Sequence, residues 1–98
     1  MCGIIGITSS KPVSSSIINS LRKLEYRGYD SAGIATLSNG VINEVKSKGR
    51  VDNLEKNLAI KNMSGLVGIG HVRWATHGIP NTINAHPHSS ENVSIVHN

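Results

Sequence analysis

Residues 32–48 read AGIATLSNGVINEVKSK, with the dipeptide Asn39-Gly40 between two runs of strand-like composition. Asparagine and glycine tolerate the positive φ angles that the tightest hairpin turn requires, so this pair is the strongest short-range hairpin signal a sequence can carry. The sequence therefore predicts two antiparallel strands, over residues 32–37 and 41–48.

The segment before the hairpin predicts one strand and one helix. Residues 3–8 (GIIGIT) form a short apolar run that suits a strand buried on both faces. Aliphatic residues then recur at helical spacing, which predicts one buried helix face. These residues are Val13, Ile17, Leu21 and Leu24. We expect the helix to end near Arg27-Gly28, with the glycine in the left-handed conformation.

The segment after the hairpin predicts a second helix and two more strands. Asp52 is expected to cap a short helix over residues 54–60. Strands are expected over 66–72 and 93–97, separated by a loop over 78–92. The order strand, helix, hairpin, helix, strand, strand predicts an α+β fold with antiparallel pairing and helices on one face of the sheet.

The composition fits one small domain of 98 residues with a net charge of +4 and a single cysteine. Basic residues are interleaved with acids and no nucleic-acid-binding motif accompanies them. One cysteine forms no internal disulfide, and no apolar run is long enough to span a membrane. We therefore expect a soluble, cytoplasmic protein with no nucleic-acid or membrane partner. The large aromatic residues available to fill its core are Trp74, Tyr26 and Tyr29.

Cys2 is the residue that most clearly offers catalytic chemistry. Removal of Met1 would make Cys2 the N-terminal residue, so that one residue supplies a thiol nucleophile and an α-amine base. The alternative is an incidental cysteine near the chain start. Cys2 alone does not decide between these two interpretations.

Four motifs occur along the chain: MCGIIG (1–6), LEYRGYDSAG (24–33), GHVRWATHG (70–78) and NAHPH (84–88). They resemble motifs of the class II glutamine amidotransferases, and the longest resembles the glutamine–fructose-6-phosphate aminotransferase branch of that family. They occur in the family's order along the chain. Purine-pathway amidotransferases and asparagine synthetases carry other residues at the second motif.

The resemblance implies an N-terminal-nucleophile hydrolase fold, an αββα sandwich that residues 1–98 would form only in part. It implies a glutaminase domain that supplies ammonia for converting fructose 6-phosphate to glucosamine 6-phosphate. Fructose 6-phosphate would bind only through a sugar-phosphate isomerase half beyond this sequence. The family resemblance also implies a homo-oligomeric parent enzyme and no cofactor.

The resemblance implies two catalytic residues: Cys2, which would attack the side-chain amide of glutamine, and Asn98, whose amide would donate to the oxyanion. Five further residues would form the glutamine pocket. They are Arg73, Trp74, Thr76, His77 and His86. Arg73 would hold the α-carboxylate, a task that suits a planar guanidinium. Trp74 would help close the pocket loop; a lone tryptophan is more often a core residue, and both interpretations stay open here.

Two other groups of residues are not expected to take part in catalysis. The motif over residues 27–30 (RGYD) is expected to be structural, with contacts around the N-terminal strand. His86 and His88, with His71 and His77, could suggest a metal site. We expect no metal, because Pro87 separates two of these histidines and the one cysteine lies at the other end of the sequence.

The sequence ends at Asn98, before the glycine N–H and the acidic residue that complete the family's glutamine site. We therefore expect little or no glutaminase activity from residues 1–98 alone. Two alternatives to an enzyme fragment stay open. One is a non-catalytic remnant that binds glutamine or a partner, and the other is a decayed gene product.

Overall fold

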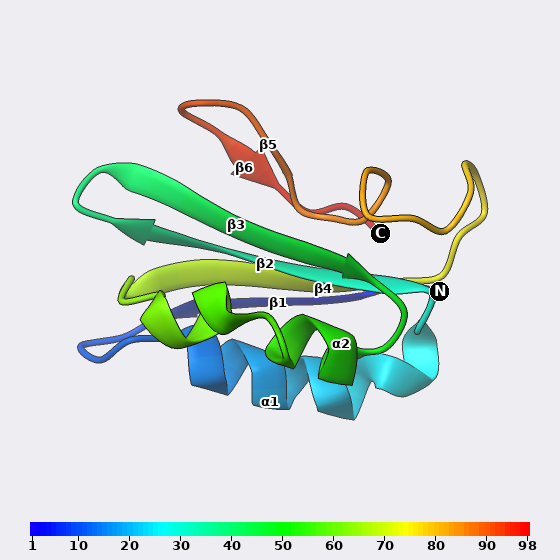
Figure 1. Ribbon diagram of the computed structural model, residues 1–98, viewed down its shortest axis with the longest axis horizontal. Coiled ribbons are helices and arrows are strands. Elements are labelled where there is room, and N and C mark those ends of the chain that lie inside the picture. The colour runs from blue at the N-terminus through cyan, green and yellow to red at the C-terminus, as the bar shows by residue number, and fades with distance from the viewer.

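A four-stranded antiparallel sheet forms the middle layer of the protein, with helices on one face and the C-terminal segment over the other (Figure 1). The computed structural model describes residues 1–98, except the side chain of Leu58. The strand order is β1-β4-β2-β3. A two-stranded β5-β6 hairpin forms a separate small sheet. The strands are β1 (Gly3–Thr8), β2 (Ser31–Ser38), β3 (Val41–Lys48), β4 (Val67–Arg73), β5 (His88–Ser89) and β6 (Ser94–Ile95).

The helices are short and lie together on one side of the sheet. They are α1 (Ser14–Leu24), α2 (Val51–Glu55) and two 3₁₀ helices, Glu25–Arg27 and Leu58–Asn62. Within the described residues, no helix is long and apolar enough to cross a membrane. The predicted α+β architecture, with antiparallel pairing and helices on one face, is confirmed.

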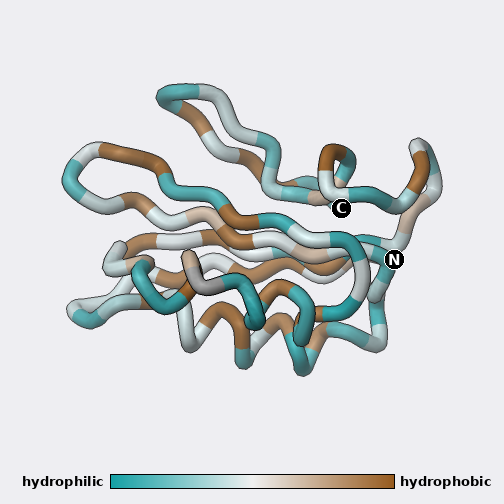
Figure 2. The backbone as a smooth tube through the Cα atoms, in the orientation of Figure 1, coloured by the Kyte–Doolittle hydropathy of each residue, from teal (hydrophilic) through white to brown (hydrophobic). Residues whose placement is uncertain are grey.

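The core lies between α1 and the sheet, where α1 presents the face predicted from its aliphatic spacing. Ile17 and Leu21 are fully buried and belong to one cluster with Ile34 of β2 and Val72 of β4. Figure 2 shows that hydrophobic residues recur along α1 and along the strands of the sheet. Because large aliphatic side chains gain about 1.5–3 kcal/mol each on full burial, this cluster is the main stabilising feature of the fold.

The central hairpin forms as predicted. Asn39 and Gly40 have φ angles of 51° and 75°, and Ser38 pairs with Val41 across the turn. Both φ angles are positive, as this tight turn requires.

The end of the first helix differs from the prediction. Gly28 has φ 178°, which is extended rather than left-handed, and a 3₁₀ turn follows α1. A Cβ at Gly28 would lie 2.5 Å from the carbonyl carbon of Arg73. The glycine is therefore required for a close approach between backbones, not for a helix cap.

The second helix and the last strand also differ. Arg50 is the N-cap of α2, and Asp52 lies in its first turn with its carboxylate 3.3 Å from Arg22. The predicted helix over 54–60 is divided between α2 and a 3₁₀ helix that begins after Asn57, whose side chain accepts from Ala59 N. The predicted strand over 93–97 forms only at Ser94–Ile95.

The core contains none of the large aromatic residues that the composition offered. Tyr26 is 78% exposed, and Tyr29 and Trp74 are each about half exposed. Aliphatic residues, mainly Ile, Leu and Val, fill the space between α1 and the sheet instead. The aromatic side chains are available for contacts at the surface.

Candidate active site

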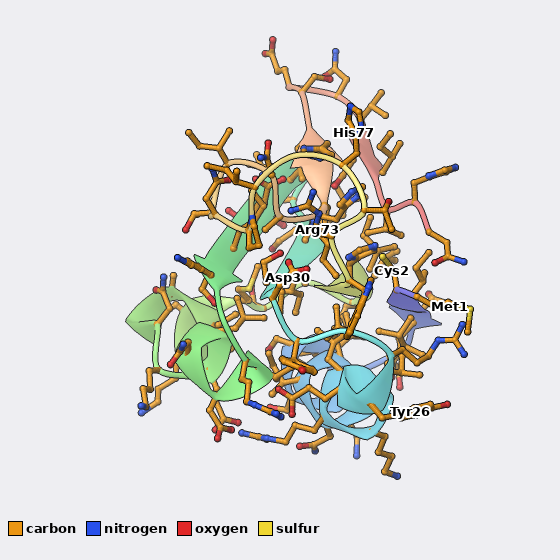
Figure 3. The ribbon with its side chains drawn as sticks, turned by 90° about the vertical axis from the view of Figure 1, so that its right-hand side faces the viewer. Met1, Cys2, Tyr26, Asp30, Arg73 and His77 are labelled. Atoms are coloured by element: carbon orange, nitrogen blue, oxygen red, sulfur yellow. The ribbon has the colours of Figure 1, made fainter. Side chains whose placement is uncertain are left out.

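Antiparallel pairing places the start of β1, the start of β2 and the end of β4 at the same end of the sheet. Gly3 of β1 pairs with Val72 of β4, and Ser31 of β2 pairs with Arg73. Cys2, Asp30 and Trp74, which directly flank these pairs in the sequence, therefore lie near one another at this end of the sheet. Figure 3 looks onto this end and shows Cys2, Asp30 and Arg73 close together.

Cys2 is held by contacts on its backbone and its sulfur. Trp74 N donates to Cys2 Sγ at 3.4 Å, and Arg27 Nε donates to the Cys2 carbonyl at 2.8 Å. Cys2 N donates to Asn98 Oδ1 at 3.0 Å, which joins the two ends of the chain. The thiol thus lies in a fixed position, although it belongs to the second residue of the chain. Arg27 has the structural contact expected of its motif.

One pocket of about 210 Å³ is lined by all seven residues that the sequence singled out. These residues are Cys2, Arg73, Trp74, Thr76, His77, His86 and Asn98. His97 also lines the pocket, and sequence reasoning did not assign it a role. A concave site where a thiol, a guanidinium and several amide, hydroxyl and imidazole groups converge is the usual form of a small-molecule site.

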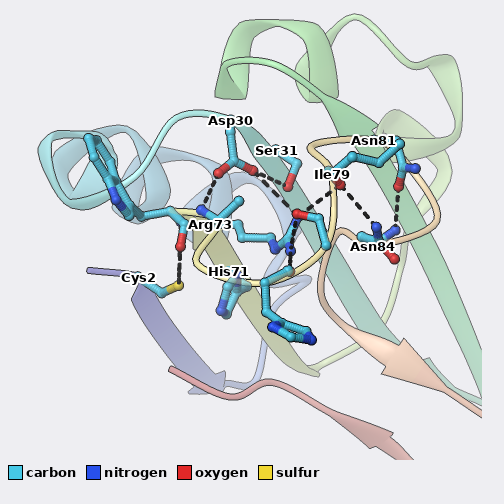
Figure 4. Close-up of polar contacts among 12 residues, drawn as sticks. Cys2, Asp30, Ser31, His71, Arg73, Ile79, Asn81 and Asn84 are labelled. Atoms are coloured by element: carbon cyan, nitrogen blue, oxygen red, sulfur yellow. Dashed lines mark hydrogen bonds and ion pairs between the residues drawn. The ribbon is translucent and has the colours of Figure 1, made fainter.

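Arg73 is almost buried, with 7% of its surface exposed. Its guanidinium donates to the carbonyl groups of Gly78 and Ile79 at 3.3 Å and also to that of His77. The Asp30 carboxylate lies 3.9 Å from Arg73 Nη1 (Figure 4). Arg73 therefore fixes the loop after β4 while it lines the pocket.

Asp30 is a hydrogen-bonding centre that sequence reasoning treated only as structural. Its carboxylate accepts from Ala75 N and from Ser31 Oγ, and its backbone N donates to the Arg73 carbonyl at 3.2 Å. Asp30 thus connects the start of β2 to the loop that follows β4. The specificity of the RGYD motif was the available signal, but spacing alone did not show which loop it contacts.

Trp74 lies at the pocket rim and contacts aromatic and cationic neighbours. Its ring meets Tyr29 edge-to-face with ring centroids 6.0 Å apart. The guanidinium of Arg50 lies 4.7 Å from the centre of the Tyr29 ring. Of the two interpretations of this tryptophan, the structure favours a surface position beside the pocket over a core position.

Three histidine rings form a column beside the pocket. His71 and His86 are stacked with centroids 4.2 Å apart, and His88 lies 4.4 Å from His86 at a tilt. Burial lowers the pKa of His86 to about 4 and also lowers the pKa of His71. Among the described side chains, no group of three or more His, Cys, Asp or Glu residues is arranged to hold a metal ion.

The fold is similar to that of the N-terminal-nucleophile glutamine amidotransferases. A solved glutamine phosphoribosylpyrophosphate amidotransferase from Bacillus subtilis superposes with a TM-score of 0.77 at 26% identity, over 96% of this chain and 20% of that one. A structure described as the allosteric regulatory enzyme of purine biosynthesis gives a TM-score of 0.78 at 26% identity, over 89% and 18%. The predicted N-terminal-nucleophile fold is confirmed.

Curated sequences give a more particular assignment. Glutamine–fructose-6-phosphate aminotransferase of Agrobacterium fabrum is 53% identical over 98 residues, which are the whole of this chain and 16% of that protein. The enzyme of the same name from Clostridium acetobutylicum is 55% identical over 100 residues, again with 16% of its length covered. The chain thus resembles the N-terminal part of glutamine–fructose-6-phosphate aminotransferases and spans about a sixth of their length. No family model matches the chain.

Proposed function

We propose that this chain forms the N-terminal part of a glutaminase site in which Cys2 attacks the side-chain amide of glutamine. The observation that carries the proposal is the single pocket that joins Cys2, Arg73 and Asn98. These residues are far apart in the sequence and have the chemistry that amide hydrolysis needs: a nucleophile, a carboxylate-binding group and an oxyanion donor.

Removal of Met1 precedes the reaction and frees the α-amine of Cys2, and Met1 is 71% exposed. The freed α-amine of Cys2 takes the proton from Sγ, and the sulfur attacks the amide carbon of glutamine. The amine then gives this proton to the leaving nitrogen, so that ammonia departs and a γ-glutamyl thioester remains. Water hydrolyses the thioester to glutamate and restores the thiol.

The contact between Asn98 and Cys2 supports the proposed role of Asn98 as the oxyanion donor. Its Oδ1 accepts from Cys2 N at 3.0 Å, so the donor end of the same amide, Nδ2, is not used by that hydrogen bond. An amide N–H held beside the nucleophile stabilises the negative oxygen of the tetrahedral intermediate. Loss of such a donor typically reduces kcat by about 10²–10³-fold.

Arg73 is the group proposed to bind the α-carboxylate of glutamine. Its guanidinium is nearly buried, and it is held by Asp30 and by the loop over residues 77–79. A cation fixed in this way pairs with a carboxylate at little further cost in side-chain entropy. Thr76, His77, His86 and His97 also line the pocket, as does the half-exposed Trp74.

The ammonia released is proposed to convert fructose 6-phosphate to glucosamine 6-phosphate, as the names of the curated relatives indicate for those enzymes. The sugar phosphate would bind outside these 98 residues, in a homo-oligomeric enzyme. A nucleophilic thiol must remain reduced, which supports a cytoplasmic location.

The test is glutamate release from glutamine by the protein expressed from its native gene, with the Cys2→Ala variant beside it. Cys2→Ala is expected to abolish use of glutamine and to leave synthesis from added ammonia intact, because only the nucleophile is lost. Retained ammonia-dependent synthesis is the control for folding. Glutamine use by Cys2→Ala at the wild-type rate would remove Cys2 from its role.

A further inference from the structure

His71 of β4 makes a contact to the end of the chain that its sequence position does not suggest. The side chain is fully buried, and Nε2 lies 2.8 Å from the carbonyl oxygen of His97. A carbonyl oxygen only accepts hydrogen bonds, so Nε2 must carry the proton and donate. The contact therefore selects one tautomer of the ring.

The residue after His97 is Asn98, whose Oδ1 accepts from Cys2 N at 3.0 Å. A hydrogen bond at the His97 carbonyl fixes the peptide plane that leads directly into Asn98. We propose that His71 is a positioning residue that holds the His97–Asn98 peptide so that the Asn98 amide stays beside Cys2. This proposal rests on the proposed function of Asn98 as the oxyanion donor.

The fold holds the His71 ring in place from the side opposite the sheet. His71 pairs with Gly33 of β2, and a Cβ at Gly33 would lie 2.0 Å from the carbonyl oxygen of His86. Glycine thus allows the segment that carries His86 to lie directly on the sheet beside His71. The His86 ring stacks on the His71 ring, with centroids 4.2 Å apart and planes 19° apart. The stack keeps the His71 ring aimed at His97.

The protonation state of His71 agrees with a donor role. Burial lowers the pKa of His71, and the nearby Arg73 and His88 lower it further, against the opposing effects of the His97 carbonyl and Asp30. The ring is therefore neutral at pH 7, with its proton on Nε2. Among the described residues, Nδ1 is buried and lacks a hydrogen-bond partner.

A residue that only filled space would not need the hydrogen bond from its ring to the His97 carbonyl. Burial of a ring nitrogen without a partner is unfavourable, and an aliphatic side chain would fill the site without that cost. The hydrogen bond from Nε2 to the chain end is the compensating contact.

The test compares His71→Gln, His71→Leu and His88→Gln in the protein expressed from its native gene. Glutamine retains an amide donor near the position of Nε2, whereas leucine fills the space and removes the donor. We expect kcat for glutamine hydrolysis to fall about tenfold or more in His71→Leu, towards the ~10²–10³-fold loss of a missing oxyanion donor. KM for glutamine should remain within about twofold, because Arg73 still binds the carboxylate.

His71→Gln should recover most of the lost kcat, and His88→Gln should have wild-type kinetics, because His88 contacts His86 but not the His97 carbonyl. A rise in KM with unchanged kcat in His71→Leu, or equal losses of kcat in the Gln and Leu variants, would overturn the proposal. The melting temperature of each variant is measured first, and if His71→Leu fails to fold it is replaced by His71→Met, which also lacks a donor.

A measurement without activity separates this proposal from the proposed function. NMR of the same protein at pH 7 should show His71 as the Nε2–H tautomer and the Asn98 side-chain amide as ordered. In His71→Leu the Asn98 amide should become mobile. An Asn98 amide that is equally ordered in His71→Leu would refute positioning by His71, whether or not the protein hydrolyses glutamine.

Discussion

Neighbouring residues of β4 are buried by different means on the two faces of the sheet. Val72 packs into the aliphatic cluster with Ile17 and Leu21 of α1. On the opposite face, His71 and Arg73 are also buried, but they are held by hydrogen bonds to the His97 carbonyl and to the loop over 77–79.

The difference separates stability from positioning. Aliphatic packing is non-directional and scales with buried area, so many side-chain combinations satisfy it. Hydrogen bonds to buried polar groups are directional, and loss of one partner leaves the other unsatisfied. The helix-facing side therefore stabilises the domain, and the opposite side fixes where Cys2, Arg73 and Asn98 lie.

The largest expected effect on stability is at the helix-facing side. Ile17→Ala should lower the free energy of unfolding by about 2–5 kcal/mol, since it removes a fully buried side chain and leaves a cavity. Ile83→Ala is the matched control, because Ile83 is 79% exposed. Urea unfolding of both variants measures the difference. Equal losses of unfolding free energy in the two variants would contradict the claim that the core, and not the segment over the other face, stabilises the domain.

The next effect is on positioning at the site edge. Asp30→Asn removes the negative charge beside Arg73 and weakens the hydrogen bond to Ala75 N. We expect kcat/KM for glutamine to fall about 10–100-fold, as for the loss of a charged hydrogen bond worth about 1.5–3 kcal/mol. Asp52→Asn is the control, because Asp52 is exposed and pairs with Arg22 at the surface. Kinetics of Asp52→Asn as poor as those of Asp30→Asn would contradict the assignment.

The smallest effect is a pH dependence of stability. Burial lowers the pKa of His86 to about 4 in the folded protein, and it also lowers the pKa of His71. An unfolded histidine titrates near pH 6.5, so the unfolded state binds more protons between about pH 6.5 and 4. Stability is complete above this window and is lost as pH falls through it. The melting temperature should drop by several degrees from pH 7 to pH 5, and less in the double variant His71→Gln/His86→Gln. An unchanged drop in that variant would show that the histidine column is not its source.

The sequence predicted the parts of the fold that depend on neighbours in the chain. The bounds of the strand over 3–8 and the Asn39-Gly40 turn were correct because their signals lie within a few residues. The prediction that this strand is buried on both faces was wrong, because β1 is at the edge of the sheet and Ile4 is 41% exposed. Gly28 was misread because its conformation is set by the backbone of Arg73, which no local pattern reveals.

The site was predicted through family resemblance, and its supporting contacts were not. The Cys2–Asn98 hydrogen bond spans 96 residues and the His71–His97 bond spans 26. Sequence spacing predicts contacts between residues within one or two helical turns or across a strand pair. It therefore predicts neither of these two long-range hydrogen bonds. His71 carried a weak signal, as a histidine in an apolar strand, but the identity of its partner requires the fold.

The most direct test of the central claim is covalent labelling of the protein isolated from its native source. A glutamine analogue with a diazoketone in place of the side-chain amide is added, and the modified residue is located by tandem mass spectrometry. We predict a single adduct on Cys2 Sγ, on chains that lack Met1, and protection by excess glutamine. A retained Met1, or labelling of Cys2 that glutamine does not prevent, would contradict Cys2 as the nucleophile of a glutamine site.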